Sequence, residues 1–202
     1  MTEHEQALLA ARPDFAAIAR WVTSGARVLD LGCGDGALLK YLWEARRAPG
    51  YGVEFDDAEV LACVKNDINV LQLDLESGLS LFDDGAFDYV VLSETLQTIR
   101  RIEQLMREML RVGREAIVAF PNFGHWAARL QVLAGRMPVS EALPYEWYNT
   151  PNVHLCTMAD FEDLCHKLGV RIRERLALHR SRPVAFLPNL LGSLAVYRCA
   201  AA

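Results

Sequence analysis

Apolar and polar residues alternate in blocks along the chain, and the blocks predict strands followed by helices. Continuous apolar runs at residues 28–31 and 87–94 are typical of parallel strands buried on both faces. Apolar residues recur at helical spacing in residues 15–22 and 102–110, which predicts amphipathic helices there. This alternation is typical of a parallel sheet covered by helices on both faces.

Further strands are predicted at residues 51–55, 69–76 and 114–120. Residues 170–178 alternate with a period of two, and residues 193–199 form a last apolar run. Only a loop is expected between these last two strands, so they should pair in antiparallel orientation. The sequence therefore predicts an α/β fold with a mostly parallel seven-stranded sheet and a C-terminal antiparallel hairpin.

No internal repeat and no low-complexity linker divides the chain. Residues 13–202 are predicted to form a single domain, and residues 1–12 a flexible N-terminal extension. Between residues 121 and 160 only one amphipathic helix is expected, and the remainder is rich in aromatic residues and prolines. Its length without regular structure predicts a binding or lid segment, although a loop packed down by its own aromatic side chains is an equal alternative.

Composition and charge exclude several classes of partner. The chain has 202 residues and a net charge of −5, so it gives no electrostatic reason to expect nucleic acid. Arg171, Arg173 and Arg175 could form a basic stripe on one face of a strand and bind nucleic acid. A solvated edge strand guarded by charge explains these arginines equally well. Five scattered cysteines without a C-x-x-C pair favour a reducing, cytoplasmic location over disulfides or a zinc site. No run approaches membrane-span length, and the polar start does not resemble a signal peptide.

The stretch VLDLGCGDG, residues 28–36, contains the candidate ligand-binding loop. Asp30 ends a buried strand, and Gly32, Gly34 and Gly36 follow at alternate positions before a predicted helix. The spacing also satisfies the dinucleotide fingerprint, but Asp30 and Asp35 would repel a diphosphate. Two carboxylates suit a ligand that carries an ammonium and a sulfonium, and the spacing resembles motif I of class I S-adenosylmethionine (SAM)-dependent methyltransferases. A dinucleotide site and an empty structural turn are the alternatives.

Other polar residues fall at the predicted carboxyl ends of strands, where ligands of such sheets bind. Glu54 comes about 20 residues after the glycines and is predicted to accept hydrogen bonds from ribose hydroxyls. Asp74 is a candidate for the adenine amino group, although Glu54 and Asp74 could also be ordinary strand-end acids. The complete set of predicted SAM contacts is Asp30, Gly32, Cys33, Gly34, Gly36, Glu54, Phe55, Asp74, Leu75 and Ser93.

Catalytic residues remain unassigned from the sequence. His125 and His154 are weak candidates for a base by residue type, and neither has a carboxylate partner visible in the sequence. No metal site is predicted. An N-P-P-Y element is absent after the fourth strand, where Ser93-Glu94-Thr95-Leu96 stands instead. Methyl transfer to exocyclic amines of nucleic acid or to protein glutamine is therefore disfavoured.

Four stretches together resemble the MetW family of methionine biosynthesis proteins: VLDLGCGDGALLKYL, VLSETLQTIR, FPNFGHW and LPYEWYNTPNVHLCT. The resemblance covers nearly the whole chain after the first ten or so residues. It implies the Rossmann-like class I methyltransferase fold and a partner protein, a homoserine O-acyltransferase of the MetX type. It thus predicts an accessory subunit that supports O-acylhomoserine formation and senses SAM or S-adenosylhomocysteine (SAH). An active small-molecule methyltransferase is the alternative.

Overall fold

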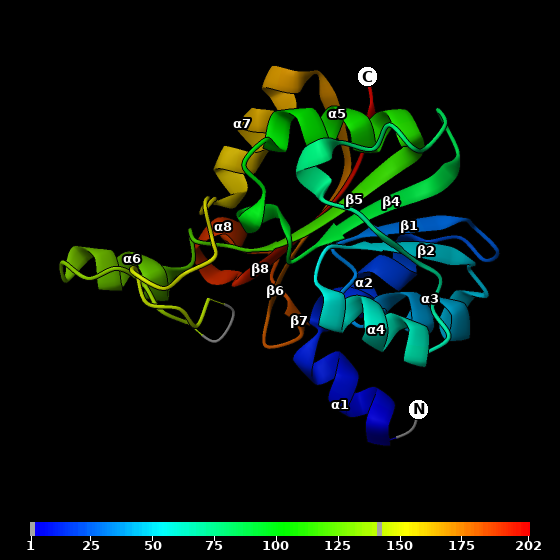
Figure 1. Ribbon diagram of the computed structural model, residues 1–202. Coiled ribbons are helices and arrows are strands. Elements are labelled where there is room, and N and C mark those ends of the chain that lie inside the picture. The colour runs from blue at the N-terminus through cyan, green and yellow to red at the C-terminus, as the bar shows by residue number, and fades with distance from the viewer. Residues whose placement is uncertain (1–2, 141–142) are drawn as a thin grey trace.

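The computed structural model describes residues 3–140 and 143–202 and shows one twisted sheet between two layers of helices (Figure 1). The sheet has the strand order β3-β2-β1-β4-β5-β8-β6-β7. Its strands are β1 Val28–Leu31, β2 Gly50–Glu54, β3 Val70–Gln72, β4 Phe87–Ser93, β5 Gly113–Pro121, β6 Val170–His179, β7 Arg182–Pro183 and β8 Leu194–Ala201.

Strands β1 to β5 pair in parallel, and β8 lies between β5 and β6, antiparallel to both. The predicted mostly parallel α/β sheet with antiparallel C-terminal strands is confirmed. The strand count differs by one, because the two-residue strand β7 pairs with the end of β6. Arg180 and Ser181 between them have φ of 48° and 63°, the left-handed conformation that two-residue hairpin turns require.

The helices follow the strands and cover both faces. They are α1 Glu3–Ala11, α2 Pro13–Trp21, α3 Ala37–Arg46, α4 Asp57–Lys65, α5 Ile102–Val112, α6 Trp126–Leu133, α7 Met158–Leu168 and α8 Pro188–Leu191, with short 3-10 helices η1 Leu75–Ser77 and η2 Leu96–Thr98. Helices α5 and α7 lie on one face of the sheet, and α2, α3 and α4 lie on the other (Figure 1). None of the described helices is long and apolar enough to cross a membrane.

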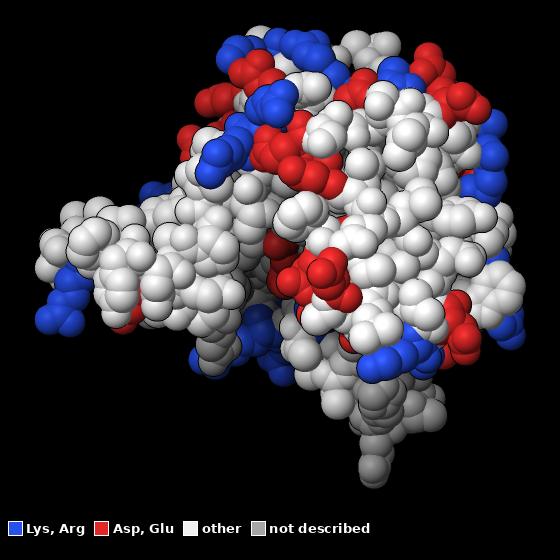
Figure 2. All heavy atoms as spheres, viewed as in Figure 1, with Lys and Arg blue, Asp and Glu red and all other residues white. Residues whose placement is uncertain are grey.

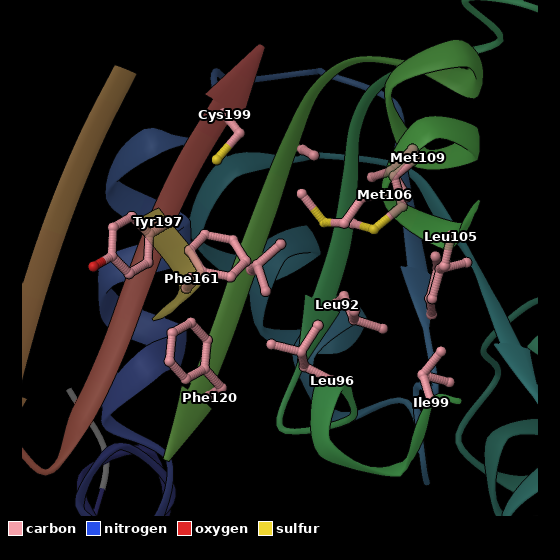
Figure 3. Packing of buried hydrophobic residues seen from close by; sticks show 14 of the residues in the cluster. Leu92, Leu96, Ile99, Leu105, Met106, Met109, Phe120, Phe161, Tyr197 and Cys199 are labelled. Atoms are coloured by element: carbon pink, nitrogen blue, oxygen red, sulfur yellow. The ribbon is translucent and has the colours of Figure 1, made fainter. Parts of the chain in front are cut away.

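The core on the α5 and α7 face combines aliphatic side chains with methionines and aromatic rings (Figure 3). Met106 and Met109 of α5 are fully buried. Phe161 of α7 packs with its ring centroid 5.1 Å from Phe120 of β5 and 4.7 Å from Tyr197 of β8. The apolar side of α5, which the sequence predicts from its helical spacing, therefore faces the sheet.

Of the extension predicted over residues 1–12, the structure describes residues 3–12, and its flexibility stays a prediction. Residues 3–11 form helix α1, and α2 begins directly afterwards with Pro13, a residue favoured at the first position of a helix. The Arg12 guanidinium lies 4.4 Å from the centroid of the Phe15 ring, and Phe15 is buried against α3 and the sheet. Leu8 and Leu9 of α1 also pack, partly buried, against this core cluster, so contacts from residue 8 onward join this stretch to the domain.

The stretch expected to be irregular up to residue 160 contains the start of α7. Thr157 and Asp160 form a reciprocal capping box: the Thr157 side chain accepts from the Asp160 N–H, and the Asp160 carboxylate accepts from the Thr157 N–H. The expected amphipathic helix at Trp126 is present as α6, but it has no buried residue. Helix α6 projects away from the sheet, at the left of Figure 1.

Replacing Phe161 tests this core. We expect Phe161→Ala to lower the free energy of unfolding by about 3–5 kcal/mol, because it removes a ring that is 1% exposed and leaves a cavity between α7 and strands β5 and β8. Phe186→Ala is the matched control, since Phe186 is 74% exposed and its loss should change the free energy by less than about 0.5 kcal/mol. Denaturant unfolding of both variants provides the measurement, and equal effects would contradict the assignment of Phe161 to the core.

Candidate ligand-binding site

The loop between β1 and α3 requires glycine at each of its three alternate positions. Gly32, Gly34 and Gly36 have φ of 69°, 54° and 81°. A Cβ on Gly32 would lie 2.6 Å from Thr95 Oγ1, so this backbone passes directly against the loop that follows β4. At Gly34 the nearest heavy atom, Glu59 Oε2, would be 3.9 Å away. The loop is therefore tightly held at its first glycine and open at its second.

The carboxylate of Glu54 holds the open part of this loop. Its Oε2 accepts a hydrogen bond from the Gly34 N–H at 2.9 Å, and its Oε1 accepts from the N–H groups of Phe55 and Asp56 at 2.7 and 3.1 Å. The predicted convergence of the glycine loop and the acid at the end of β2 is thus present. An ionised carboxylate has about four acceptor positions, so Oε2 keeps one for a ligand hydroxyl.

Asp30 lies at the same edge of the sheet and is almost completely buried, with 2% exposure. Burial raises the pKa of its carboxyl to about 7; the Arg12 guanidinium opposes this rise, and the neighbouring carboxylates of Asp14 and Glu54 add to it. A further positive charge beside Asp30 would stabilise the ionised form of its carboxyl.

A polar cluster that the sequence analysis missed joins α2 to the end of β4. The Arg12 guanidinium donates to Asp14 Oδ2 at 2.8 Å and to Ser93 Oγ at 3.0 Å, and Ser93 Oγ donates to Asp14 Oδ2 at 2.5 Å. The hydroxyl of Ser93, predicted to contact the ligand, is therefore engaged with α2. Its direct contact with SAM stays a prediction.

Glu94 follows Ser93 and completes this cluster. Its carboxylate lies 3.5 Å from the Arg12 guanidinium, and its N–H donates to the Ala119 carbonyl at 2.8 Å. Glu94 has φ of 55°, a left-handed conformation that is costly for a residue with a side chain and that clusters at functional sites. Burial raises the pKa of its carboxyl, while Arg12 lowers it. The sequence signal for this cluster was the polar run Ser93-Glu94-Thr95 at the end of a buried apolar strand.

The remaining predicted contacts lie along the edge formed by β2 and β3. The Leu73 N–H donates to the Glu54 carbonyl at 3.0 Å, which places the start of the Asp74 turn beside the end of β2. The Asp74 carboxylate caps η1 by accepting from the Glu76 N–H at 2.9 Å, and Leu75 packs half-buried on the core. Phe55 is 68% exposed, so an apolar ring face is available at this edge.

Cys33 points into the protein rather than toward this edge. It is buried, and its Sγ lies 3.7 Å from the Sγ of Cys63 on α4. Cys63 donates to the Gly34 carbonyl at 3.0 Å, and burial raises the pKa of both thiols. The side chain of Cys33 thus supports the loop from behind, and only its backbone faces the edge where a ligand is predicted. All five cysteines are free thiols.

The two histidines considered as bases have separate surroundings. His125 precedes α6; its ring centroid is 5.0 Å from that of His179, and its Nε2 is buried without a hydrogen-bond partner among the described residues. Burial, followed by His179, lowers the pKa of His125. His154 is exposed, with Nε2 3.4 Å from the Arg100 carbonyl oxygen. The structure does not bring the two rings into one site.

The residues at this edge fit a ligand with an adenosine and an amino-acid part. The glycine backbone is open, Glu54 has a free acceptor position, and buried Asp30 lies behind the loop. Acidic side chains gather near the middle of the view beside α4 (Figure 2). Within the described ranges 3–140 and 143–202, no group of three or more His, Cys, Asp or Glu residues is arranged to hold a metal ion.

This fold is that of SAM-dependent methyltransferases. Solved structures of such enzymes share it: one from Mesorhizobium loti (TM-score 0.70, 15% identity, 94% of this chain and 97% of the other) and one from Archaeoglobus fulgidus (0.68, 16%, 95% and 92%). A TehB-like SAM-dependent methyltransferase from Corynebacterium glutamicum is also similar (0.64, 16%, 98% and 95%). At these identities the similarity shows the fold alone.

The family is defined by sequence. The model of the family described as "Methionine biosynthesis protein MetW" matches residues 12–199, and the chain belongs to this family. A curated relative from Rhodopirellula baltica, described as "Bifunctional methionine biosynthesis protein MetXA/MetW", is 40% identical over 173 residues. The match covers 81% of this chain and 28% of the relative, so the chain spans just over a quarter of that protein's length.

Asp30 generates a pH-dependent prediction. Its folded-state pKa of about 7 lies above the ordinary value of 3.8, so the folded protein binds the extra proton between these values. The free energy of unfolding of the wild type, relative to Asp30→Asn, should therefore fall as pH rises from about 4 to about 7, at up to about 1.4 kcal/mol per pH unit, and then level off. Denaturant unfolding across this range measures it. A difference that stays constant with pH would contradict a buried, protonated Asp30.

Proposed function

We propose that this protein is a SAM-binding accessory partner of homoserine O-acyltransferase that supports O-acylhomoserine formation. The observation that carries the proposal is the relative in which a MetW part is joined in one chain with MetXA. Fusion into one chain favours the association of two proteins that act together, because the tether raises the effective concentration of each for the other. Because the chain belongs to a methionine biosynthesis family, we assign it to the same pathway step and place it in the cytoplasm, where free thiols persist.

SAM or SAH is proposed as the ligand that this partner senses. The open backbone at Gly34, the acceptor position on Glu54 and the cation-favouring surroundings of Asp30 support this assignment. Bound SAM supplies a positively charged sulfonium and a transferable methyl group. SAM is made from methionine, so the concentration of SAM reflects the output of the methionine pathway. A partner that senses SAM would pass this signal to an early enzyme of the same pathway.

A second candidate function, methyl transfer to a small molecule, is favoured by the shared fold with SAM-dependent methyltransferases. Methyl transfer needs mainly in-line positioning of the acceptor and the sulfonium, so it does not require a base. A cavity lined by Leu96, Gln97, Phe120, His154 and neighbouring residues lies near the ends of β4 and β5, with a volume of about 20 Å³. This volume holds roughly one water molecule, so an acceptor would require the 143–156 segment to move.

Gly34→Val tests the ligand assignment. A branched side chain here would project from the open part of the loop, and we expect the affinity for SAM and SAH to fall by more than about tenfold, as measured by calorimetry. Gly169→Val is the matched control, because Gly169 has φ of 69° and open space around its Cβ position but lies at the end of α7. Undiminished affinity in Gly34→Val would count against the loop, provided that both variants unfold cooperatively.

The accessory role is tested by the rate of a MetX-type homoserine O-acyltransferase from the same organism, assayed alone and with this protein across a SAM titration. We expect the rate to rise on mixing and then to respond to SAM. A rise that ignores SAM would support the partnership and reject SAM sensing. An unchanged rate would reject the partnership, and methyl transfer from SAM to small-molecule acceptors would then be assayed.

A further inference from the structure

Helix α6 and the chain that follows it form an apolar projection, which we call the arm and define as residues 126–140 and 143–156. Among its exposed side chains, Leu133 is 83%, Trp147 72% and Tyr148 70% exposed. Other large apolar side chains of the arm that are at least one-third exposed are Trp126, Leu130, Val132, Met137, Val139, Tyr145, Val153 and Leu155. So much apolar surface on one projection marks an interaction site.

Hydrogen bonds hold the arm in a defined shape. Gln131 on α6 bonds to Val139 twice: its Nε2 donates to the Val139 carbonyl at 3.1 Å, and its Oε1 accepts from the Val139 N–H at 3.2 Å. At the base, Arg129 Nε donates to the Gly124 carbonyl at 2.6 Å. At the far end, the N–H groups of Val153 and His154 both donate to the Gln97 carbonyl. A preorganised surface loses little conformational entropy when a partner docks.

The charge of the arm selects a protein partner. The charged residues of the arm are Arg129, Arg136 and Glu146, whereas 23% of the whole chain is charged. Two positive charges and one negative charge, with no lysine, do not suit an anionic membrane or nucleic acid. Figure 2 shows this projection as largely uncharged surface next to a body that carries many charged groups. Depletion of charge together with Trp and Tyr is the composition of a protein interface core.

We infer that the arm is the docking surface for the acyltransferase partner, with Trp147 and Tyr148 as its anchors. This inference rests on the proposed function. The occupant is chosen because nearly three-quarters of the fused relative lies outside the match to this chain, and that protein's description attributes a MetXA part to it. The rings of Trp147 and Tyr148 pack edge to face with centroids 5.7 Å apart, so the pair presents one aromatic surface to the partner.

Trp147→Ala and Leu133→Ser test the arm in separate places, on the aromatic pair and on α6. Binding to the MetX-type acyltransferase is measured by calorimetry or surface capture, and each variant is expected to raise Kd by about 30-fold or more. The matched controls are Trp43→Ala on α3 and Leu81→Ser before β4, since both side chains are at least half exposed and lie outside the arm. All four variants should keep the wild-type unfolding transition and affinity for SAM.

The outcomes distinguish the two levels of the proposal. Weaker binding by the arm variants, with unchanged controls, supports the arm as the docking surface. If the wild type binds the acyltransferase and the arm variants bind it equally well, this inference is overturned and the proposed function stays in place. If the wild type does not bind the acyltransferase, the proposed function fails and the inference fails with it. Self-association of the wild type, measured by sedimentation and lost in the arm variants, overturns the inference in favour of a second copy of this chain.

Discussion

The turn between β1 and α3 fixes the shape of the candidate ligand-binding edge, because three left-handed glycines follow one another at alternate positions. The N–H groups of Gly32 and Cys33 both donate to the Val53 carbonyl, at 2.8 and 3.1 Å, and Gly34 donates to Glu54. The loop is thus fastened to the end of β2 along its length. Any side chain at Gly32 would collide with Thr95, so the same turn also sets the distance between β1 and the segment after β4.

Acidic groups outnumber cations among the described side chains at this edge of the sheet. Asp14 and Asp30 are buried, Glu94 is partly buried, and the guanidinium of Arg12 is the cation placed among them. Burial raises the pKa of Asp30 most; Arg12 opposes this rise, and the carboxylates of Asp14 and Glu54 add to it, so Asp30 takes up a proton more readily than a solvated acid does. A cationic ligand would complete the neutralisation that Arg12 begins. This electrostatic preference disfavours a diphosphate, whose negative charge would lie beside these carboxyl groups.

The sequence predicts the central sheet well because buried parallel strands are continuous apolar runs, and β1 and β4 lie within the predicted ranges. It also predicts that Gly34 and Glu54 converge, because their spacing is a property of the βαβ unit. The Arg12 cluster could not be predicted, since its partners Ser93 and Glu94 are some eighty residues away and only the packing of α2 brings them together. Helix α7 was missed because its capping box, Thr157 with Asp160, lay inside a stretch dominated by prolines and aromatic residues.

The candidate ligand site and the arm share one short structural element, the segment that follows β4. Gln97 accepts the N–H groups of Val153 and His154 at 2.8 and 3.0 Å, and its side-chain amide donates to the Glu94 carbonyl at 2.7 Å. Glu94 in turn pairs with Arg12 at the ligand edge. Movement of Glu94 would therefore act on the same backbone that holds the end of the arm. The proposed role as a sensing accessory subunit needs such a physical link between the two surfaces, since a ligand changes partner affinity only through a contact that differs between the two states.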